Sequence, residues 1–150
     1  MNEIRQYIIE AYYYGKKGAG VLVISQETNR ALIAYRSRYV EEPHTWNIIS
    51  GKIDGNEDPK TAALRELREE TEYRGTVKFV DSLKWNAPDA DFKFYNFIGL
   101  VDEEFKAHPN WETEQFKWVT YQQLLGLSNK HFGLENLIQK KKSSIRRHMT

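Results

Sequence analysis

One stretch of this 150-residue chain limits its fold more than any other, because it carries its own helix start signal. Asp58 can accept hydrogen bonds from the unpaired N–H groups of a first helical turn. Pro59 suits the first helical position, where a missing N–H leaves no acceptor unpaired. Strong helix formers follow as far as Thr71, and Gly75 marks the expected stop. We therefore predict a helix over residues 59–71 that ends near Gly75.

The predicted helix is flanked by segments rich in β-branched and aromatic residues, which favour strands. These segments are 7–9, 12–14, 21–24, 31–35 and 46–49 before the helix, and 76–80, 83–85, 92–101 and 116–119 after it. Turn residues at 15–18 and 27–29 separate neighbouring strands, so residues 21–35 predict a hairpin. Two further helices are expected at 122–125 and 134–145. Because hairpins outnumber strand–helix–strand units and no linker is visible, we predict one mixed α/β domain over residues 1–150 with a mixed sheet.

The composition excludes some classes of site and partner. The chain has no cysteine, which excludes a disulfide scaffold, a thiolate zinc site and a cysteine nucleophile. The first ten residues do not resemble a signal peptide, and the apolar run 19–24 is too short to span a bilayer, so we expect a cytoplasmic protein with no membrane partner. The net charge is +1, and we interpret the basic residues 140–142 and 146–147 as a solvated helix end. No specific nucleic-acid partner is expected.

Acidic side chains crowd one face of the predicted helix. With about 100° between successive residues of an α-helix, Glu66, Glu69 and Glu70 fall within an arc of about 100° that also contains the small Ala62. Like charges at this spacing repel one another. A hard cation removes that repulsion, and Mg²⁺ prefers oxygen ligands supplied by a few carboxylates together with substrate phosphates. The helix therefore offers a candidate magnesium site.

An ordinary solvated acidic face explains the same spacing, and by spacing alone it is the more common arrangement. Arg65 and Glu69 are four residues apart, as are Arg68 and Glu72, so ion pairs can weaken the repulsion. The segment before the helix favours the metal site instead. Gly51 and Gly55 permit close approach of a ligand to the backbone, and Glu57 ends this loop just before the helix.

The loop and the helix together resemble a known family signature, the Nudix box. Gly51 is followed after five residues by Glu57, and after seven more by the run Arg65-Glu66-Leu67-Arg68-Glu69-Glu70. This is the spacing of the box, and the glycine, arginine and glutamate residues that define its chemistry are all present. Trp46 upstream and the strand 116–119 downstream also resemble flanking sequence of the family. The similarity covers most of the domain, and its specificity resides in the box.

The resemblance implies a Nudix-type α/β/α sandwich around a mixed β-sheet. It also implies Mg²⁺-dependent hydrolysis of a diphosphate linkage in a nucleoside diphosphate derivative, with Mn²⁺ able to substitute. Carried over by position, the metal ligands are Glu66, Glu69 and Glu70, with the Gly51 carbonyl as an added ligand and Glu57 supporting the metal shell. Arg65 is then expected to orient a box glutamate, and its i+4 neighbour Glu69 is the favoured partner.

The chain departs from the family pattern in and beside the box. Glu72 stands where the late glycine is usual, and Tyr73 replaces an aliphatic residue. The entry is Ile49-Ser50-Gly51 instead of Pro-Gly-Gly, and Asn56 stands where glycine is common. We expect these changes to alter loop shape and substrate detail more than the metal site, with Gly75 taking over the turn after the helix.

Other residues are candidates to complete the site. In this family the base that activates water is either a box glutamate, here Glu69 or Glu70, or an acid from a distant loop. Glu112 resembles such a loop acid and is predicted to be a metal ligand or base, with Glu114, Asp89 and Asp91 as substitutes. Arg36 and Arg38 are candidates to bind phosphates, although ordinary surface arginines explain them equally well. Trp46 is the predicted base-stacking residue among the candidates Tyr35, Tyr39, Trp46, Trp85 and Trp111.

The substrate is left open by the sequence. ADP-ribose, dinucleoside polyphosphates, nucleotide sugars, dinucleotide cofactors and nucleoside triphosphates all fit, and an ADP-linked compound is favoured. A non-catalytic nucleotide sensor with the same fold is an alternative, although the box acids are intact. An isoprenoid diphosphate isomerase is disfavoured because the chain lacks cysteine. The expected partner is a small nucleotide, and a homodimer through the N-terminal strands is a further hypothesis.

Overall fold

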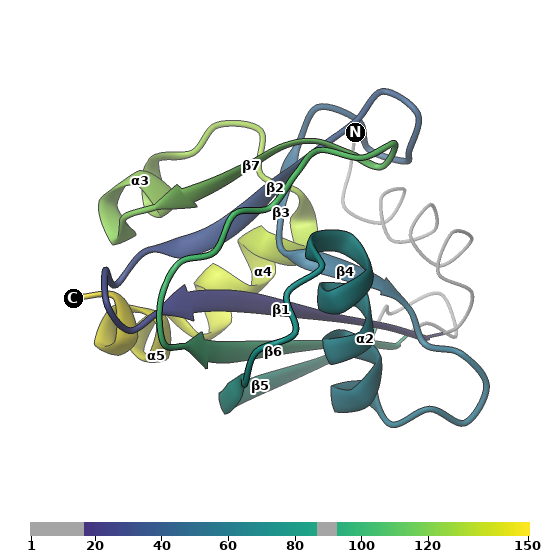
Figure 1. Ribbon diagram of the computed structural model, residues 1–150, viewed down its shortest axis with the longest axis horizontal. Helices are drawn as coiled ribbons and strands as arrows, with labels where there is room; N and C mark the ends of the chain where they lie inside the picture. Colours follow the sequence, from purple (N-terminus) through teal and green to yellow (C-terminus); the bar gives the residue numbers. More distant parts are fainter. Residues whose placement is uncertain (1–16, 87–92) are drawn as a thin grey trace.

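The computed structural model describes residues 17–86 and 93–150, which form one mixed sheet with helices on both faces (Figure 1). The strands are β1 (Lys17–Ser25), β2 (Ala31–Arg36), β3 (Trp46–Asn47), β4 (Ile49–Lys52), β5 (Lys78–Asn86), β6 (Lys93–Val101) and β7 (Thr113–Val119). The helices are α2 (Pro59–Thr71), α3 (Tyr121–Gly126), α4 (Phe132–Lys140) and α5 (Lys142–Met149). The strands β1 and β6 pair in parallel and the other pairs are antiparallel, so the prediction of a mixed sheet is confirmed.

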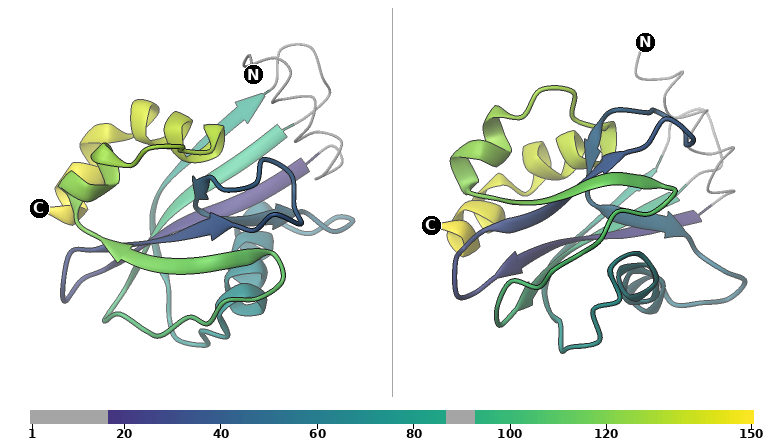
Figure 2. Two further views of the ribbon diagram at one scale, coloured as in Figure 1. Left: turned by 90° about the horizontal axis from the view of Figure 1, so that it is seen from above. Right: turned by 45° about the horizontal axis from the view of Figure 1, so that its top comes forward.

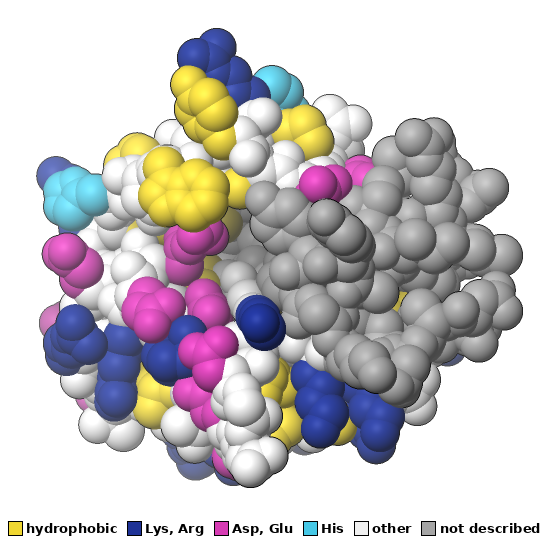
Figure 3. Space-filling model, turned by 90° about the vertical axis from the view of Figure 1, so that its right-hand side faces the viewer, with side chains coloured by type: hydrophobic (Ala, Val, Ile, Leu, Met, Phe, Trp, Pro, Cys, Tyr) yellow, Lys and Arg dark blue, Asp and Glu magenta, His cyan; other side chains and the backbone are white. Residues whose placement is uncertain are grey.

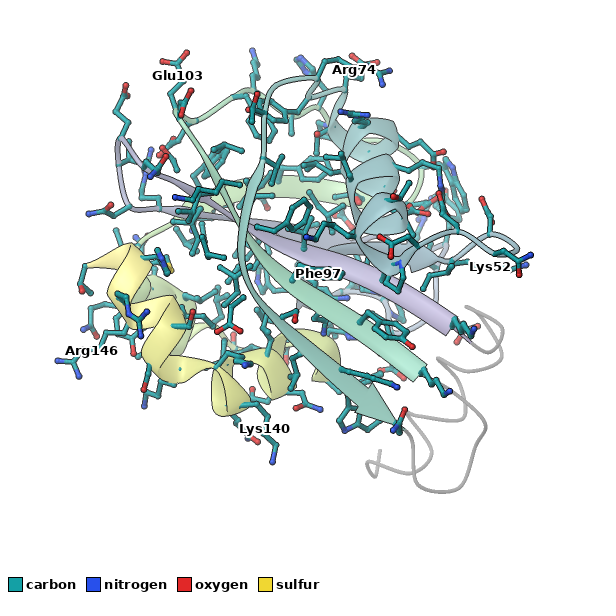
Figure 4. The ribbon with its side chains drawn as sticks, turned by 90° about the horizontal axis from the view of Figure 1, so that it is seen from below. Lys52, Arg74, Phe97, Glu103, Lys140 and Arg146 are labelled. Carbon is teal, nitrogen blue, oxygen red and sulfur yellow. The ribbon has the colours of Figure 1, made fainter. Side chains whose placement is uncertain are left out.

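Side-chain alternation along β1 explains the layers. Ala19, Val21 and Val23 point to one face, where they pack with Leu67 of α2. Leu22 and Ile24 point to the other face, toward α3, α4 and α5. Figure 2 shows the sheet between these two groups of helices, and Figure 4 shows Lys140 and Arg146 on the side away from α2. The expected α/β/α sandwich is confirmed, and the basic C-terminal residues lie far from the acidic helix.

The sheet splays open along one edge of β1. Near its C-terminal end, β1 pairs with β2 through Val23 and Leu32. Near its N-terminal end, the same edge of β1 pairs with β4, with Ala19 opposite Gly51. The strand β2 meanwhile pairs with β3 and β7. A gap therefore opens between β2 and β4, and it lies next to α2.

The acidic helix begins as its sequence predicts and ends in a different way. The Asp58 side chain accepts hydrogen bonds from Lys60 N and Thr61 N at 3.1 and 3.3 Å, and Pro59 occupies the first position. The helix ends at Thr71 because Glu72 adopts a left-handed backbone conformation, with φ of 66°. The expectation that Gly75 takes over this turn is wrong, since Gly55 is the only described glycine with positive φ. A side chain on Gly75 would instead overlap the Tyr73 hydroxyl.

Other elements differ from their predicted bounds. Residues 76–80 and 83–85 contribute to one strand, β5, which a register shift between Phe79 and Asp81 keeps paired to β6. The predicted strand 46–49 divides into β3 and β4, and the predicted helix 134–145 divides into α4 and α5. The second division occurs at Lys141, whose φ of −123° is not helical, and it lets both segments bury their own apolar residues.

Some predictions lie partly or wholly outside the described residues. Residues 17 and 18 already belong to β1 and not to a turn. The predicted strands 7–9 and 12–14, the dimer through them, and Asp89 and Asp91 lie outside the described residues. Among the described helices, none combines the length and apolar character needed to cross a membrane.

Replacing Glu72 with glycine should stabilise the protein, because the left-handed conformation at this position is unfavourable for a residue with a Cβ atom. We expect Glu72→Gly to raise the free energy of unfolding by about 1 kcal/mol and the Tm by about 3 °C. Thermal unfolding measures the change. The matched control is Thr61→Gly at an exposed right-handed position of α2, which should not be stabilising. An unchanged or lowered Tm for Glu72→Gly would contradict the prediction.

Candidate active site

A close approach between strand and helix begins the site. Gly51 lies on β4 directly beneath α2, and a Cβ atom built on it would overlap the Glu66 carboxylate. The Glu66 side chain is only 13% exposed, so its carboxylate is held in the angle between β4 and α2. Gly51 is therefore needed for the space that its missing side chain leaves, and not for an unusual backbone conformation.

Arg65 joins the glycine loop to the acidic helix. Its Nε and Nη2 donate to the two Glu57 carboxylate oxygens at 2.9 and 3.0 Å, and Nη2 also donates to the Lys52 carbonyl at 2.8 Å. Its Nη1 donates to Glu66 at 3.0 Å and to Glu69 at 3.2 Å. The expected pair with Glu69 is present, but the paired hydrogen bonds go to Glu57. The Arg65 guanidinium lowers the pKa of Glu57, which stays ionised.

A second loop approaches the helix from the far end of the chain. Asn110 Nδ2 and Thr113 Oγ1 each donate to Glu70 Oε2 at 3.1 Å. Asn110 Oδ1 in turn accepts from Glu112 N at 2.9 Å and Thr113 N at 3.0 Å, so this side chain shapes the loop that carries Glu112. These contacts hold the Glu112 carboxyl group within hydrogen-bonding distance of Glu70.

Crowding and burial of the acids alter their protonation. Burial raises the pKa of Glu112 to about 8, and hydrogen bonding and charge repulsion from Glu70 add to the shift. Burial likewise raises the pKa of Glu66 to about 7, against the opposing attraction of Arg65. The acids therefore meet in a region that disfavours further negative charge, and a bound cation would reverse that preference.

Two clefts meet at these acids. The first has a volume of about 210 Å³ and fills the gap between β2 and β4, where Ala34, Ile48 and Ile49 give it an apolar lining. The second has a volume of about 460 Å³, is more polar, and lies between α2 and the loop 108–112. Residues that border both clefts are Glu66, Glu70, Trp111 and Glu112. Figure 3 shows a face of the molecule on which acidic side chains gather.

Of the other predicted site residues, some line the clefts and others do not. Arg36 lines the first cleft, and its Nε donates to the Glu41 carbonyl at 2.7 Å. Arg38 lines neither cleft and donates to the Tyr39 hydroxyl. Trp46 also lines neither cleft, because its ring packs beside Tyr35 at 4.7 Å between centroids and against the core on the α4 side. Glu114 points away and pairs with His44 at 3.6 Å.

The residues that position the Glu112 loop are not among those predicted from the sequence. Asn110 and Thr113 bracket Glu112, and Ser37 donates from its hydroxyl to the Trp111 carbonyl at 2.7 Å. Short polar residues at these positions are common in surface turns, and no local pattern marks them. Only their contacts with Glu70 and β2 identify them.

The donor set suits a hard divalent cation. Carboxylate oxygens from Glu66, Glu69, Glu70 and Glu112 border the second cleft, and Mg²⁺ and Mn²⁺ prefer such oxygen ligands. Within residues 17–86 and 93–150, no group of three acidic or histidine side chains is arranged around a single point. Glu66 and Glu69 turn to Arg65, and Glu70 turns to Asn110 and Thr113. Metal binding therefore requires these side chains to change rotamer, while α2 and the loops supply the right donors.

The chain is similar to proteins of a known family over most of its length. The family model described as NUDIX domain matches residues 16–140. The chain belongs to the Nudix family. An RNA pyrophosphohydrolase of Bartonella bacilliformis is 35% identical over 135 residues, covering 73% of this chain and 79% of the relative.

Other curated relatives match the Nudix chain over shorter regions. A CMP-5'-(N-acetyl-N-hydroxy-3-aminopropyl)phosphonate hydrolase of Streptomyces rubellomurinus is 38% identical over 66 residues, which is 44% of this chain. That match spans 32% of the relative's length. A solved Nudix hydrolase from M. smegmatis, RenU, is similar with a TM-score of 0.75, 18% identity, and coverage of 88% of this chain and 86% of that chain. This structural similarity supports the Nudix fold.

The raised pKa values predict a pH-dependent stability of the metal-free protein. Unfolded glutamates titrate near 4.5, whereas folded Glu66 and Glu112 keep their protons to about pH 7 and 8. The folded state therefore binds more protons in this window, so stability is highest near pH 5 and falls as the pH rises to about 8. With a chelator present, Glu112→Gln should melt about 3 °C or more above the wild type at pH 8.5, and the difference should shrink at pH 5.

The control for this measurement is Glu114→Gln, two residues further along the chain, at an exposed position of β7 outside both clefts. Its melting curve should follow the wild type at both pH values. Equal Tm values for Glu112→Gln and the wild type at pH 8.5 would show that ionisation of Glu112 does not destabilise the folded protein.

Proposed function

We propose that this domain hydrolyses the diphosphate linkage of a nucleoside diphosphate derivative, with Mg²⁺ as the natural metal and Mn²⁺ as a substitute. The observation that carries the proposal is the meeting of Glu66, Glu69 and Glu70 from α2 with Glu112 from a distant loop along one cleft. A purely solvated acidic face would not need a buried glutamate beside Gly51 or a fourth acid brought against it.

In this proposal Glu66, Glu69 and Glu70 hold the metal, with the Gly51 carbonyl as an added ligand. The metal would offset the charge of the phosphate oxygens and acidify the attacking water. Glu57 keeps Arg65 in place, and Arg65 in turn limits the rotamers of Glu66 and Glu69. Arg36 lines the first cleft and would bind a phosphate oxygen of the substrate.

Glu112 is the proposed general base. Its carboxylate takes a proton from the attacking water as the water oxygen bonds to phosphorus, and the phosphorus bond to the bridging oxygen breaks. The bridging oxygen leaves with the second phosphate group. A base works best when its pKa lies near the working pH, and the half-buried position of Glu112 raises its pKa in that direction. Glu70 as its hydrogen-bonding neighbour keeps it at the metal side of the cleft.

The nature of the nucleotide is a separate proposal. The relatives named RNA pyrophosphohydrolase and CMP-phosphonate hydrolase act on different compounds, as their names state, and the similar C. elegans structure is an Ap4A hydrolase. Another similar solved structure is that of a bifunctional enzyme, named in part ADP ribose pyrophosphatase, in complex with AMP and Mn ion. We favour an ADP-linked compound, with nucleoside triphosphates as the alternative substrate class.

The direct test combines metal dependence with charge-removing substitutions. Purified protein is incubated with ADP-ribose, a dinucleoside tetraphosphate, a nucleotide sugar and a nucleoside triphosphate, with Mg²⁺ or with chelator, and the products are identified. We expect turnover only with metal, and we expect Glu70→Gln and Glu112→Gln each to lower kcat at least a hundredfold because each removes a charged group at the reacting centre. Glu114→Gln is the matched control and should keep wild-type turnover. Tight nucleotide binding without turnover would favour a sensor instead.

Gly51→Ala tests whether the bare backbone at Gly51 is required for the metal site. The new Cβ atom would displace the Glu66 carboxylate, which is the flexible end of a side chain, so the fold should survive while the site is distorted. We expect Mn²⁺ affinity, measured by calorimetry, to fall at least tenfold, with the circular dichroism spectrum unchanged. The matched control is Gly126→Ala, where a Cβ atom meets no neighbour within 4 Å. Wild-type Mn²⁺ affinity in Gly51→Ala would remove Glu66 from the proposed ligands.

A further inference from the structure

Trp111 leaves an unusually large aromatic surface in contact with water. Its side chain is 63% exposed, and among the described residues only Tyr39, at 64%, is a comparably exposed large hydrophobic residue. Within the described part of the chain, the Trp111 ring has no aromatic partner, whereas Tyr35 and Trp46 pack against each other. Exposure of an indole ring to water costs free energy, so an exposed tryptophan at this place indicates that the ring binds a ligand or a partner.

The backbone of Trp111 is nevertheless held firmly. Its carbonyl accepts a hydrogen bond from the Ser37 hydroxyl at 2.7 Å. On one side Asn110 is tied to Glu70, and on the other the Glu112 carbonyl accepts from Ser37 N at 2.9 Å. The indole is thus an exposed ring on an anchored loop, which can bind a flat ligand without first ordering that loop.

The position of the ring points to a ligand of the active site. Trp111 borders both clefts and directly precedes Glu112, so this residue lies at the junction where the acids gather. Figure 3 shows hydrophobic side chains beside the group of acidic side chains on this face. Tyr39 lines neither cleft, and its ring already lies under the Arg38 guanidinium at 4.9 Å.

We propose that Trp111 is the stacking surface for the nucleobase of the substrate. This inference rests on the proposed function, because it assumes that the phosphates lie at the acids beside it. The nucleobase lies flat on the indole at the mouth of the first cleft, which Val40 and Trp111 border, and the phosphates extend toward Glu66 and Glu70. Stacking replaces two water-exposed aromatic faces with one contact and tolerates any base, since every base has a π-face.

A flat, uncharged heteroaromatic ring fits this place better than a protein partner. The exposed apolar surface of Trp111 is one ring beside clefts that Glu66, Glu70 and Glu112 also line, and a stable protein interface buries a far larger area. The base-stacking role predicted for Trp46 is therefore assigned to Trp111, because Trp111 borders both clefts and Trp46 borders neither.

The test separates the base from the phosphates. Calorimetry with Mg²⁺ measures the affinity of the wild type, Trp111→Ala, Trp111→Phe and Tyr39→Ala for four probes: ADP, UDP, ribose 5-phosphate and inorganic diphosphate. We expect Trp111→Ala to weaken ADP and UDP binding roughly tenfold to a hundredfold, and to leave diphosphate and ribose 5-phosphate affinity unchanged. Trp111→Phe should retain most of the nucleotide affinity, and the matched control Tyr39→Ala should retain all of it.

Because Trp111 is exposed, its replacement should leave the Tm unchanged, and this is checked for each variant. Equal nucleotide affinity of Trp111→Ala and the wild type would overturn the inference, as would a wild type that binds diphosphate as tightly as ADP. If Trp111→Ala loses nucleotide affinity but the wild type hydrolyses none of the compounds, the stacking surface stands and the proposed hydrolysis fails. If hydrolysis proceeds with an unchanged KM in Trp111→Ala, the proposed function stands and this inference fails.

Discussion

The hydrogen bonds between Arg65 and Glu57 are the interaction on which the site depends. Both residues are largely shielded from solvent, with side chains 25% and 16% exposed, and their paired hydrogen bonds tie the loop after β4 to the first turns of α2. The remaining Arg65 donors reach Glu66, Glu69 and the Lys52 carbonyl, so one guanidinium sets the position of the loop backbone and of two carboxylates. Without this pair, Arg65 would no longer be fixed between the loop and the helix. The acids Glu66, Glu69, Glu70 and Glu112 would then repel one another without a cationic side chain held beside them.

The splayed edge of β1 explains where the substrate can be accommodated. Since β2 leaves β1 and β4 takes its place along the same edge, backbone and apolar side chains of both strands line a hollow directly beside α2. The strand β7 then pairs with β2 and brings the loop that precedes it across the open end. Strand pairing, and not the acidic helix alone, therefore unites Glu112 and Trp111 with the box residues.

The sequence predicted the local parts of this arrangement well. The Asp58 cap, Pro59 and the hairpin of β1 and β2 depend on a few adjacent residues, and the structure has each of them in place. The box acids lie on α2, and their role as metal ligands stays a prediction. Predictions that depend on contacts between distant parts of the chain agree with the structure in some cases and not in others. The placement of Glu112 beside Glu70 agrees with its expected proximity to the box, whereas Trp46 faces the opposite layer and Arg38 lies on the surface.

Helix capping, the 3.6-residue period and the box spacing are properties of consecutive residues, so the sequence by itself determined the acidic helix, its start and its family. Tertiary structure alone decided that Glu72 ends the helix in a left-handed conformation, that Glu57 receives the paired hydrogen bonds of Arg65, and that Trp111 borders both clefts. Each of these results depends on which backbone segments pair or pack across the sheet. Such pairing is selected by the burial of the whole core, and no short stretch of sequence contains that information.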